Sequence, residues 1–145
     1  MTFDLGTLGK LLFWTISIGM FLYEIYQMAM ANSTKNWKSH SAKVIDVKID
    51  IRVDEGTEES KPIIKYQYHY KGSFYKGSKV KYGILWFTHL GKAHAMVSGL
   101  KKGSEITVFV NPHRPNQSVL YQGYEGNALL LLAFFSVFFF IAAIV

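Results

Sequence analysis

The sequence contains no cysteine, so neither a disulfide nor a zinc site built on thiolates can form. This absence fits any cellular compartment and does not choose between them. Acidic residues are also scarce, because 10 aspartates and glutamates stand against 16 lysines and arginines, for a net charge of +6. Such a basic balance favours acidic partners, such as anionic lipid headgroups, nucleic acid or an acidic protein face.

The motifs of common catalytic sites are missing as well. The sequence has no HExxH, no GxSxG elbow and no phosphate loop that ends in GKS or GKT. His89 and His94 are five residues apart, about 140° around a helix axis, so they do not share the face that a metal pair needs. The members of a Ser-His-Asp catalytic triad come together only in the folded chain, so the sequence does not decide whether one is present. The sequence therefore predicts a non-enzymatic protein without a cofactor or a metal site.

Nearly all the long apolar runs lie near the two ends of the chain. Residues 11–30 (LLFWTISIGMFLYEIYQMAM) and 128–145 (ALLLLAFFSVFFFIAAIV) match the roughly 20 residues that a helix needs to cross a bilayer. The second run has no charged residue, and Ser136 is its only polar side chain. We expect two transmembrane helices. Cleavage of the first as a signal peptide is the less favoured alternative, because the run is long and a second one follows.

Two charged residues bracket part of the first run. Lys10 and Glu24 enclose 13 residues, which rise about 20 Å, less than the ~30 Å of the hydrocarbon core. We expect these two side chains near opposite membrane interfaces, with Tyr23 and Tyr26 forming an aromatic belt beside Glu24. The alternative is a proton or ion path through Glu24, for which the second run supplies few polar partners.

The basic residues after the first run indicate on which side the middle of the chain lies. Lys35, Lys38 and Lys43 are candidate contacts to lipid headgroups. Lysines close to a membrane span tend to stay in the cytoplasm, so we expect a cytoplasmic domain with both termini outside. Long loops translocate largely regardless of charge, so an external domain is the alternative.

Between the two runs the sequence alternates as β-strands do. Residues 44–53 (VIDVKIDIRV) alternate apolar and charged side chains, which predicts a strand with one dry face. That face is expected to hold Ile45, Val47, Ile49, Ile51 and Val53. Residues 54–60 (DEGTEES) predict an acidic turn or loop with Gly56 as its pivot, and Pro62 is expected to open a second strand.

The second strand is rich in tyrosine. Tyr66, Tyr68 and Tyr70 fall on one face, and the lysines of the strand fall on the other. Single-stranded nucleic acid is held by aromatic and basic side chains on one surface, so this separation argues against a nucleic-acid partner. We expect the tyrosines in the core, with their phenols at its rim.

The elements expected further along are a hairpin turn at 71–73, a strand at 84–88, one short helix within 89–100, and strands at 106–110 and 118–121. The fold class that follows is a membrane protein whose two transmembrane helices flank a mostly antiparallel β domain, a small sandwich or partly open barrel with one short helix. Its expected parts are a short tail at 1–10, membrane helices at 11–30 and 128–145, and the β-rich domain at 31–127.

The order of these features resembles a known family. Trp37 opens the part between the apolar runs, and Gly72 and Tyr75 follow the tyrosine-rich strand. Asn111-Pro112 and Pro115 stand where that family has a Tyr-Asn-Pro-x-x-Pro-like turn, although Phe109-Val110 shifts the usual aromatic by one position. The chain resembles a large bacterial family of uncharacterised membrane proteins, a family of domains of unknown function. The resemblance implies a small β-domain at a membrane and no activity.

Asn111, Pro112 and Pro115 are interpreted as a structural turn. The two prolines fix φ and remove two backbone donors, so a strand has to end there, and the Asn111 side chain can cap the turn. A ligand-binding loop is the alternative.

From these features we predict a membrane-anchored, non-enzymatic binding or accessory module whose β-domain engages a protein partner at the bacterial inner (plasma) membrane. Membrane lipid is the second expected partner, and nucleic acid is not expected. Assembly into a homo-oligomer is an alternative that the sequence leaves undecided. The alternative function is an immunity protein against a membrane- or envelope-targeted toxin, since a small protein with two membrane helices and an exposed domain suits that task.

Overall fold

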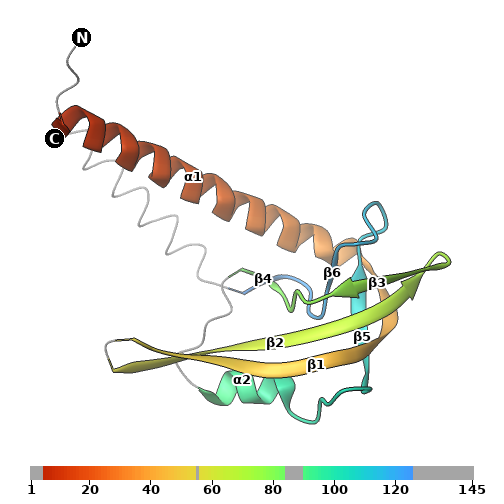
Figure 1. Ribbon diagram of the computed structural model, residues 1–145. Coiled ribbons are helices and arrows are strands. Elements are labelled where there is room, and N and C mark those ends of the chain that lie inside the picture. Colours follow the sequence, from red (N-terminus) through yellow and green to blue (C-terminus); the bar gives the residue numbers. More distant parts are fainter. Residues whose placement is uncertain (1–4, 55, 84–89, 126–145) are drawn as a thin grey trace. The chain divides into compact units, whose positions relative to one another are not determined.

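The computed structural model describes residues 5–54, 56–83 and 90–125. The chain divides into two units, one of Met1–Ala29 with Asn127–Val145 and one of Met30–Gly126. Helix α1 (Leu5–Ser33) begins in the first unit, and the 3-10 helix η1 (Thr34–Asn36) follows it in the second (Figure 1). The run 11–30 is therefore helical throughout, within a helix that is longer than expected.

The two expected membrane spans have different outcomes. Among the residues that the structure describes, no helix combines the length and the apolar character that a membrane crossing needs, so the span expected over 11–30 gains no support. Thr15, Ser17, Glu24 and Gln27 are polar side chains within this run. The span expected over 128–145 lies outside the described residues.

The second unit is a small, mostly antiparallel β domain with one short helix among its described residues, as predicted. Its sheet has the order β3-β2-β1-β5-β6, and each neighbouring pair runs antiparallel. The strands are β1 (Lys38–Asp54), β2 (Thr57–Tyr70), β3 (Ser73–Gly77), β5 (Glu105–Val110) and β6 (Ser118–Val119). Two short strands, β4 (Tyr82–Gly83) and β7 (Tyr124–Glu125), pair in parallel, and α2 (Leu90–Val97) packs against β1 and β2.

Most of the other expected elements are present. The turn at 71–73 joins β2 to β3, and its central residues Lys71 and Gly72 have φ of +47° and +85°, as a tight type I′ hairpin requires. The helix expected within 89–100 is α2, and the strands expected at 106–110 and 118–121 are β5 and β6. The strand expected at 84–88 lies outside the described residues.

The two edges of the sheet are joined beyond β3 and β6. The backbone N–H groups of Leu120 and Tyr121 donate to the Val80 carbonyl at 3.0 and 2.9 Å, and β4 then pairs with β7. Because β5 returns after a long connection to lie beside β1, strands β3, β2, β1 and β5 form a Greek key. The bonds to the Val80 carbonyl bring the two edges of the five-stranded sheet together, as in a partly open barrel.

The acidic turn or loop expected over 54–60 is confirmed at its pivot, Gly56, but its extent is wrong, because β1 and β2 form one long hairpin. β2 begins at Thr57, directly after a tight turn in which Gly56 has φ of +81°. Cross-strand pairing continues through the acidic stretch, and Arg52 faces Glu59 there. Opposite charges that face each other across an antiparallel pair contribute roughly 0.2–1 kcal/mol, which favours strand over loop.

The start expected for the second strand is also wrong, because Pro62 lies inside β2 and faces Ile49 of β1. A proline is tolerated in a strand only where its missing N–H is not needed by a neighbour. β3 pairs with β2 only over Tyr66–Tyr70, so the side of β2 away from β1 has no described strand at Pro62.

A β-bulge between Val44 and Asp46 changes which side chains of β1 face the core. Before the bulge the even-numbered side chains face inward, and after it the odd-numbered side chains do. The expected dry face is correct only in part, because Ile51 is 48% exposed and Val53 is 74% exposed at the far end of the strand. Alternation in a sequence shows neither an inserted residue nor the point where the covering elements end.

The core of the barrel is centred on Tyr66 of β2, a residue predicted to lie inside. Its ring is fully buried, and its phenol donates to the Lys79 carbonyl at 3.0 Å and shares a hydrogen bond with the Ser118 hydroxyl at 3.1 Å. Burial raises the pKa of the Tyr66 phenol far above its usual value, because the phenolate would lose its hydration. Tyr66 thereby connects β2 to the two segments that close the barrel.

Gly77 allows this packing at the end of β3. A Cβ built at Gly77 would lie 2.5 Å from Cε2 of Tyr66 and 2.6 Å from the Ser118 hydroxyl oxygen, which are impossible contacts. The closing side of the barrel therefore requires a residue without a side chain at this position.

The chain enters and leaves the β domain at one place. The Thr34 hydroxyl accepts a bond from the Gly123 N–H at 2.9 Å, and the Gln122 side-chain amide donates to the Thr34 carbonyl at 2.6 Å. A second buried cluster surrounds this junction and consists of Ala31, Trp37, Tyr82 and Val119. Trp37 therefore opens the β domain, and the residues just before β7 are held beside it.

We expect Tyr66→Phe to lower the free energy of unfolding by about 1–3 kcal/mol, because Ser118 and the Lys79 carbonyl would lose a buried partner. Tyr75→Phe is the matched control. Tyr75 is half-buried and stacks on Tyr68 with ring centroids 5.8 Å apart. Removing its hydroxyl should therefore change the free energy of unfolding by no more than about 0.5 kcal/mol. Urea unfolding of the full chain in detergent, followed by circular dichroism, measures both. Equal unfolding midpoints for the two variants would contradict the role of the Tyr66 phenol.

Candidate binding groove along the open edge of β1

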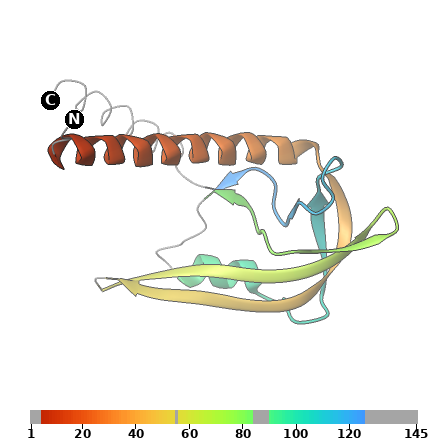
Figure 2. The ribbon, with the colours of Figure 1, turned by 45° about the horizontal axis from the view of Figure 1, so that its top comes forward.

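β1 is paired on one edge along most of its length but on the other edge only near its start. β2 faces β1 from Ala42 to Asp54, whereas β5 faces it only from Lys38 to Lys43. Two further backbone bonds join Val44 to Ser104 and Gly103, at 2.9 and 2.8 Å. Both views show the hairpin of β1 and β2 extending past β5 (Figures 1 and 2).

The far half of β1 therefore has an open edge. From Asp46 to Asp54, no described strand pairs with β1 on the side away from β2. Alternate residues of such an edge direct backbone N–H and C=O groups outward, where another strand can bind them. The opposite edge of the hairpin differs, because Pro62 on β2 removes a donor in the middle of it.

A groove of about 500 Å³ lies along this open edge. We call it the edge groove, and its lining residues are Ile45, Asp46, Val47, Lys48, Ile49, His94, Val97, Leu100, Lys101 and Lys102. One wall is β1, and the other is the end of α2 with the loop that follows it. Val97 and Leu100 are half-buried and pack against the core, so the groove has an apolar floor.

Positive charge predominates around the edge groove. The exposed side chains of Lys48, Lys101 and Lys102 line it, together with that of His94. Asp46 is the acidic side chain among its lining residues. The groove therefore combines an open backbone edge, an apolar floor and a basic rim, which suits an extended chain that carries acidic and apolar residues.

A second hollow of about 450 Å³ lies nearer to β5. Lys43, His69 and the exposed ring of Phe74 line it, and the rings of His69 and Phe74 meet edge-on at 5.1 Å. Glu105 also lines this hollow and faces Lys43 across the pair of β1 and β5. This hollow differs from the edge groove because β5 already pairs with the edge of β1 here, so no strand edge is open to a ligand.

The charged residues singled out in the sequence are not brought to one site. Glu24 lies on α1 and is only 7% exposed, and its Oε1 atom has no hydrogen-bond partner among the described residues. Lys10 also lies on α1, and its side chain is outside the described part of the structure. Lys35 and Lys38 are exposed at the entry to the β domain, whereas Lys43 is five residues further along β1, roughly 16 Å away.

The turn that begins at Asn111 is held by its own hydrogen bonds. Oδ1 of Asn111 accepts from the backbone N–H groups of His113 and Arg114 at 3.0 and 3.2 Å. The side-chain amide of Asn111 also donates to Oε1 of Gln117 at 2.9 Å, and the Tyr68 phenol donates to the Pro115 carbonyl at 2.6 Å. Hydrogen bonds therefore stabilise the turn internally and also connect it to the core strand β2.

The edge groove was missed by sequence reasoning. Its open edge results from a difference in length, because the 17 residues of β1 face a strand β5 of 6 residues. The signal available in the sequence was the long alternation of 44–53 beside the short apolar run of 106–110, which leaves part of the longer strand unpaired.

These features define a small, partly open β-barrel domain with one open strand edge, and a fold of this kind does not fix a function by itself. The family described as "Domain of unknown function (DUF3592)" matches residues 40–125, which span β1 to β7 and include the edge groove. The chain belongs to this family, which confirms the expected membership of an uncharacterised family. Neither a curated protein nor a solved structure matches the chain.

We expect Asn111→Ala to lower the free energy of unfolding by about 1–2 kcal/mol, because the turn would lose the side chain that bonds two backbone N–H groups and Gln117. Asn116→Ala is the matched control, since Asn116 is exposed in the same turn. Thermal and urea unfolding of the full chain measure both variants. A loss of the same size in the control would show that the cap of Asn111 is not what stabilises the turn.

Proposed function

We propose that the chain is a membrane-anchored, non-enzymatic binding module whose β-domain engages a protein partner through the edge groove. The observation that carries this proposal is the unpaired half of β1 beside an apolar floor. A polypeptide is the ligand whose donors and acceptors repeat with the spacing of a strand edge, about 3.3 Å per residue. Binding by strand addition needs no catalytic group.

The exposed apolar side chains at the tip of the hairpin support the same proposal. Ile51 and Val53 lie on β1 directly beyond the residues that line the edge groove. Single exposed apolar residues are ordinary, but two in a row on one face of an open strand extend the apolar floor of the groove. A partner that covers the edge would also remove both from water.

The proposed anchor consists of the apolar segments at the two ends of the chain. On α1 the side chains of Ser17, Glu24 and Gln27 are buried, whereas the exposed Thr15 hydroxyl donates to the Leu11 carbonyl of the same helix at 2.8 Å. The exposed large side chains of the same helix are apolar or aromatic, namely Leu8, Leu11, Leu12, Ile16, Ile18, Met20, Leu22, Tyr23, Ile25 and Tyr26. This pattern is the reverse of a helix surrounded by water and is typical of polar groups turned inward in a membrane. Residues 128–145 add a run without charge.

The lysines that follow α1 support a cytoplasmic β-domain at the inner membrane of a bacterium. Single-cysteine labelling tests this, because the chain has no cysteine of its own. In Thr57→Cys, the exposed start of β2 should react with a membrane-impermeant maleimide only after the membrane is broken. In Thr2→Cys, the matched control near the amino terminus, labelling should occur in intact spheroplasts. Labelling of Thr57→Cys in intact spheroplasts would place the domain outside.

The partner itself is tested by photo-crosslinking in cells. A photoreactive phenylalanine in place of Lys48, which lines the edge groove, should give one discrete protein adduct. The same amino acid in place of Lys76, exposed on β3, is the matched control and should give none. Adducts of equal yield at both positions, or none at either, would contradict a binding site in the groove. An adduct with an envelope-targeted toxin would favour the immunity alternative.

A further inference from the structure

We infer that the occupant of the edge groove is a second copy of this chain, bound so that the open edges of the two β1 strands pair antiparallel around Ile49. The inference rests on the proposed function only in that the groove binds protein. It follows from the charge order, the exposed apolar residues and the length of the open edge.

The charge order of β1 is self-complementary. Four exposed charged side chains alternate along its outer face in the order Asp46, Lys48, Asp50 and Arg52. In an antiparallel pair centred on Ile49, Asp46 of one copy faces Arg52 of the other, and Lys48 faces Asp50. Each opposite pair then occurs twice, as the two-fold symmetry of an isologous interface requires.

The neighbouring strands extend this complementarity across four strands. Within one copy, Lys65 faces Asp46 and Arg52 faces Glu59 across the pair of β1 and β2. The row across both copies would therefore read Lys65, Asp46, Arg52 and Glu59, with alternating sign at each step. Moving the centre of the pair by one residue to Lys48 would place Asp46 against Asp50 and Lys48 against Lys48, which is repulsive.

The apolar residues left exposed in one copy would fill the groove of the other. In the same register Ile51 faces Val47, and Val53 faces Ile45, on the side of the sheet that α2 covers. Val47 and Ile45 line the edge groove above Val97 and Leu100. Pairing would thus cover Val53, which is 74% exposed in the single copy, with the apolar floor of its partner.

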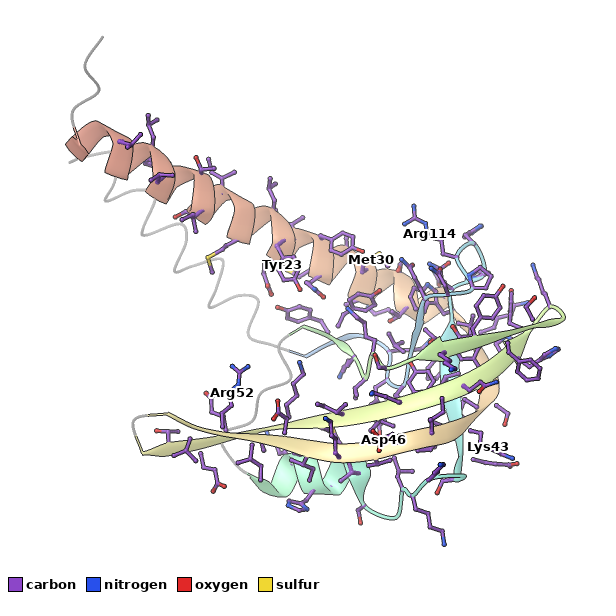
Figure 3. All side chains as sticks on the ribbon, viewed as in Figure 1. Tyr23, Met30, Lys43, Asp46, Arg52 and Arg114 are labelled. Atoms are coloured by element: carbon purple, nitrogen blue, oxygen red, sulfur yellow. The ribbon has the colours of Figure 1, made fainter. Side chains whose placement is uncertain are left out.

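The open edge has the length that this pairing uses. The bonds of Val44 to Gly103 and Ser104 end the pairing with the β5 side, and the turn after Asp54 ends the strand. A pair centred on Ile49 runs from 45 to 53 in both copies, so it fits between these limits. Lys43, Asp46 and Arg52 mark successive parts of the strand in Figure 3.

The basic rim of the groove then meets an acidic segment. The register places the acidic end of the second copy's hairpin, which carries Glu58 and Glu59, beside the loop that carries Lys101 and Lys102. The sequence from 54 to 60 (DEGTEES) has four acidic residues and no basic one. The two α2 helices also have room, because β2 strands on either side of a β1 pair lie about 14 Å apart, more than the 8–10 Å of packed helices.

Charge reversal tests the inference on the full chain in detergent, with the protein mass measured by light scattering. The unchanged chain should have twice its monomer mass of 16.5 kDa. Lys48→Asp and Asp50→Lys should each raise the dissociation constant of the dimer about tenfold or more, because symmetry turns two attractive pairs repulsive. The double variant, with both reversals, restores the opposite pairs and should restore the dimer. Lys76→Asp on β3 is the control and should leave the mass unchanged.

Disulfide formation tests the register. Lys48→Cys and Asp50→Cys face each other in the proposed pair, within the Cα separation of 4.4–6.8 Å that a disulfide needs. Co-expressed copies carrying one change each should oxidise to a mixed dimer, whereas each variant alone should give at least tenfold less. A chain that stays monomeric, or a dimer that ignores charge reversal and forms no mixed disulfide, overturns the inference. A crosslink at Lys48 to a different protein would overturn it while the proposed function stands.

Discussion

The structure depends on one unequal pairing, because β1 is longer than the strands available on one of its sides. β2 accompanies β1 to the hairpin turn, but β5 and the loop before it end at Val44. The first half of β1 therefore lies within the barrel, paired on both sides, and the second half is an edge. The bulge between Val44 and Asp46 lies at this transition and exchanges the faces of the strand there. The groove, its basic rim and the exposed tip all follow from this arrangement.

The closed half is specified by buried polar contacts as much as by apolar packing. The phenol of Tyr66 bonds to both segments that join the sheet edges, and Gly77 leaves room for its ring. These bonds are satisfied and buried, so each fixes one arrangement of strands and penalises others. The hydrogen bond from the Gly123 N–H to the Thr34 hydroxyl likewise favours one arrangement of the two segments by which the chain enters and leaves the domain.

The sequence predicted what depends on local pattern. Alternation located β1, and the inward face of Tyr66 and Tyr68 followed from it. Turn chemistry located the hairpin at 71–73 and the turn at Gly56, but it extended the second turn to residue 60, because acidic residues in a paired strand resemble a solvated loop. The lengths of neighbouring strands, the bulge and the closing pair of β4 and β7 are tertiary properties, so the edge groove was not predicted. Gly77 resembles a turn glycine in sequence, and only its contact with Tyr66 shows why it is there.

In the proposed assembly a second copy covers the open edge of β1. Amide hydrogen exchange of the full chain in detergent, over a range of protein concentrations, measures this most directly. Alternate amides of residues 46–52 are expected to become more protected as concentration rises, while those of 38–43, paired with β5, do not change. Protection of 46–52 that is independent of concentration, or a rise confined to other strands, would contradict this assembly.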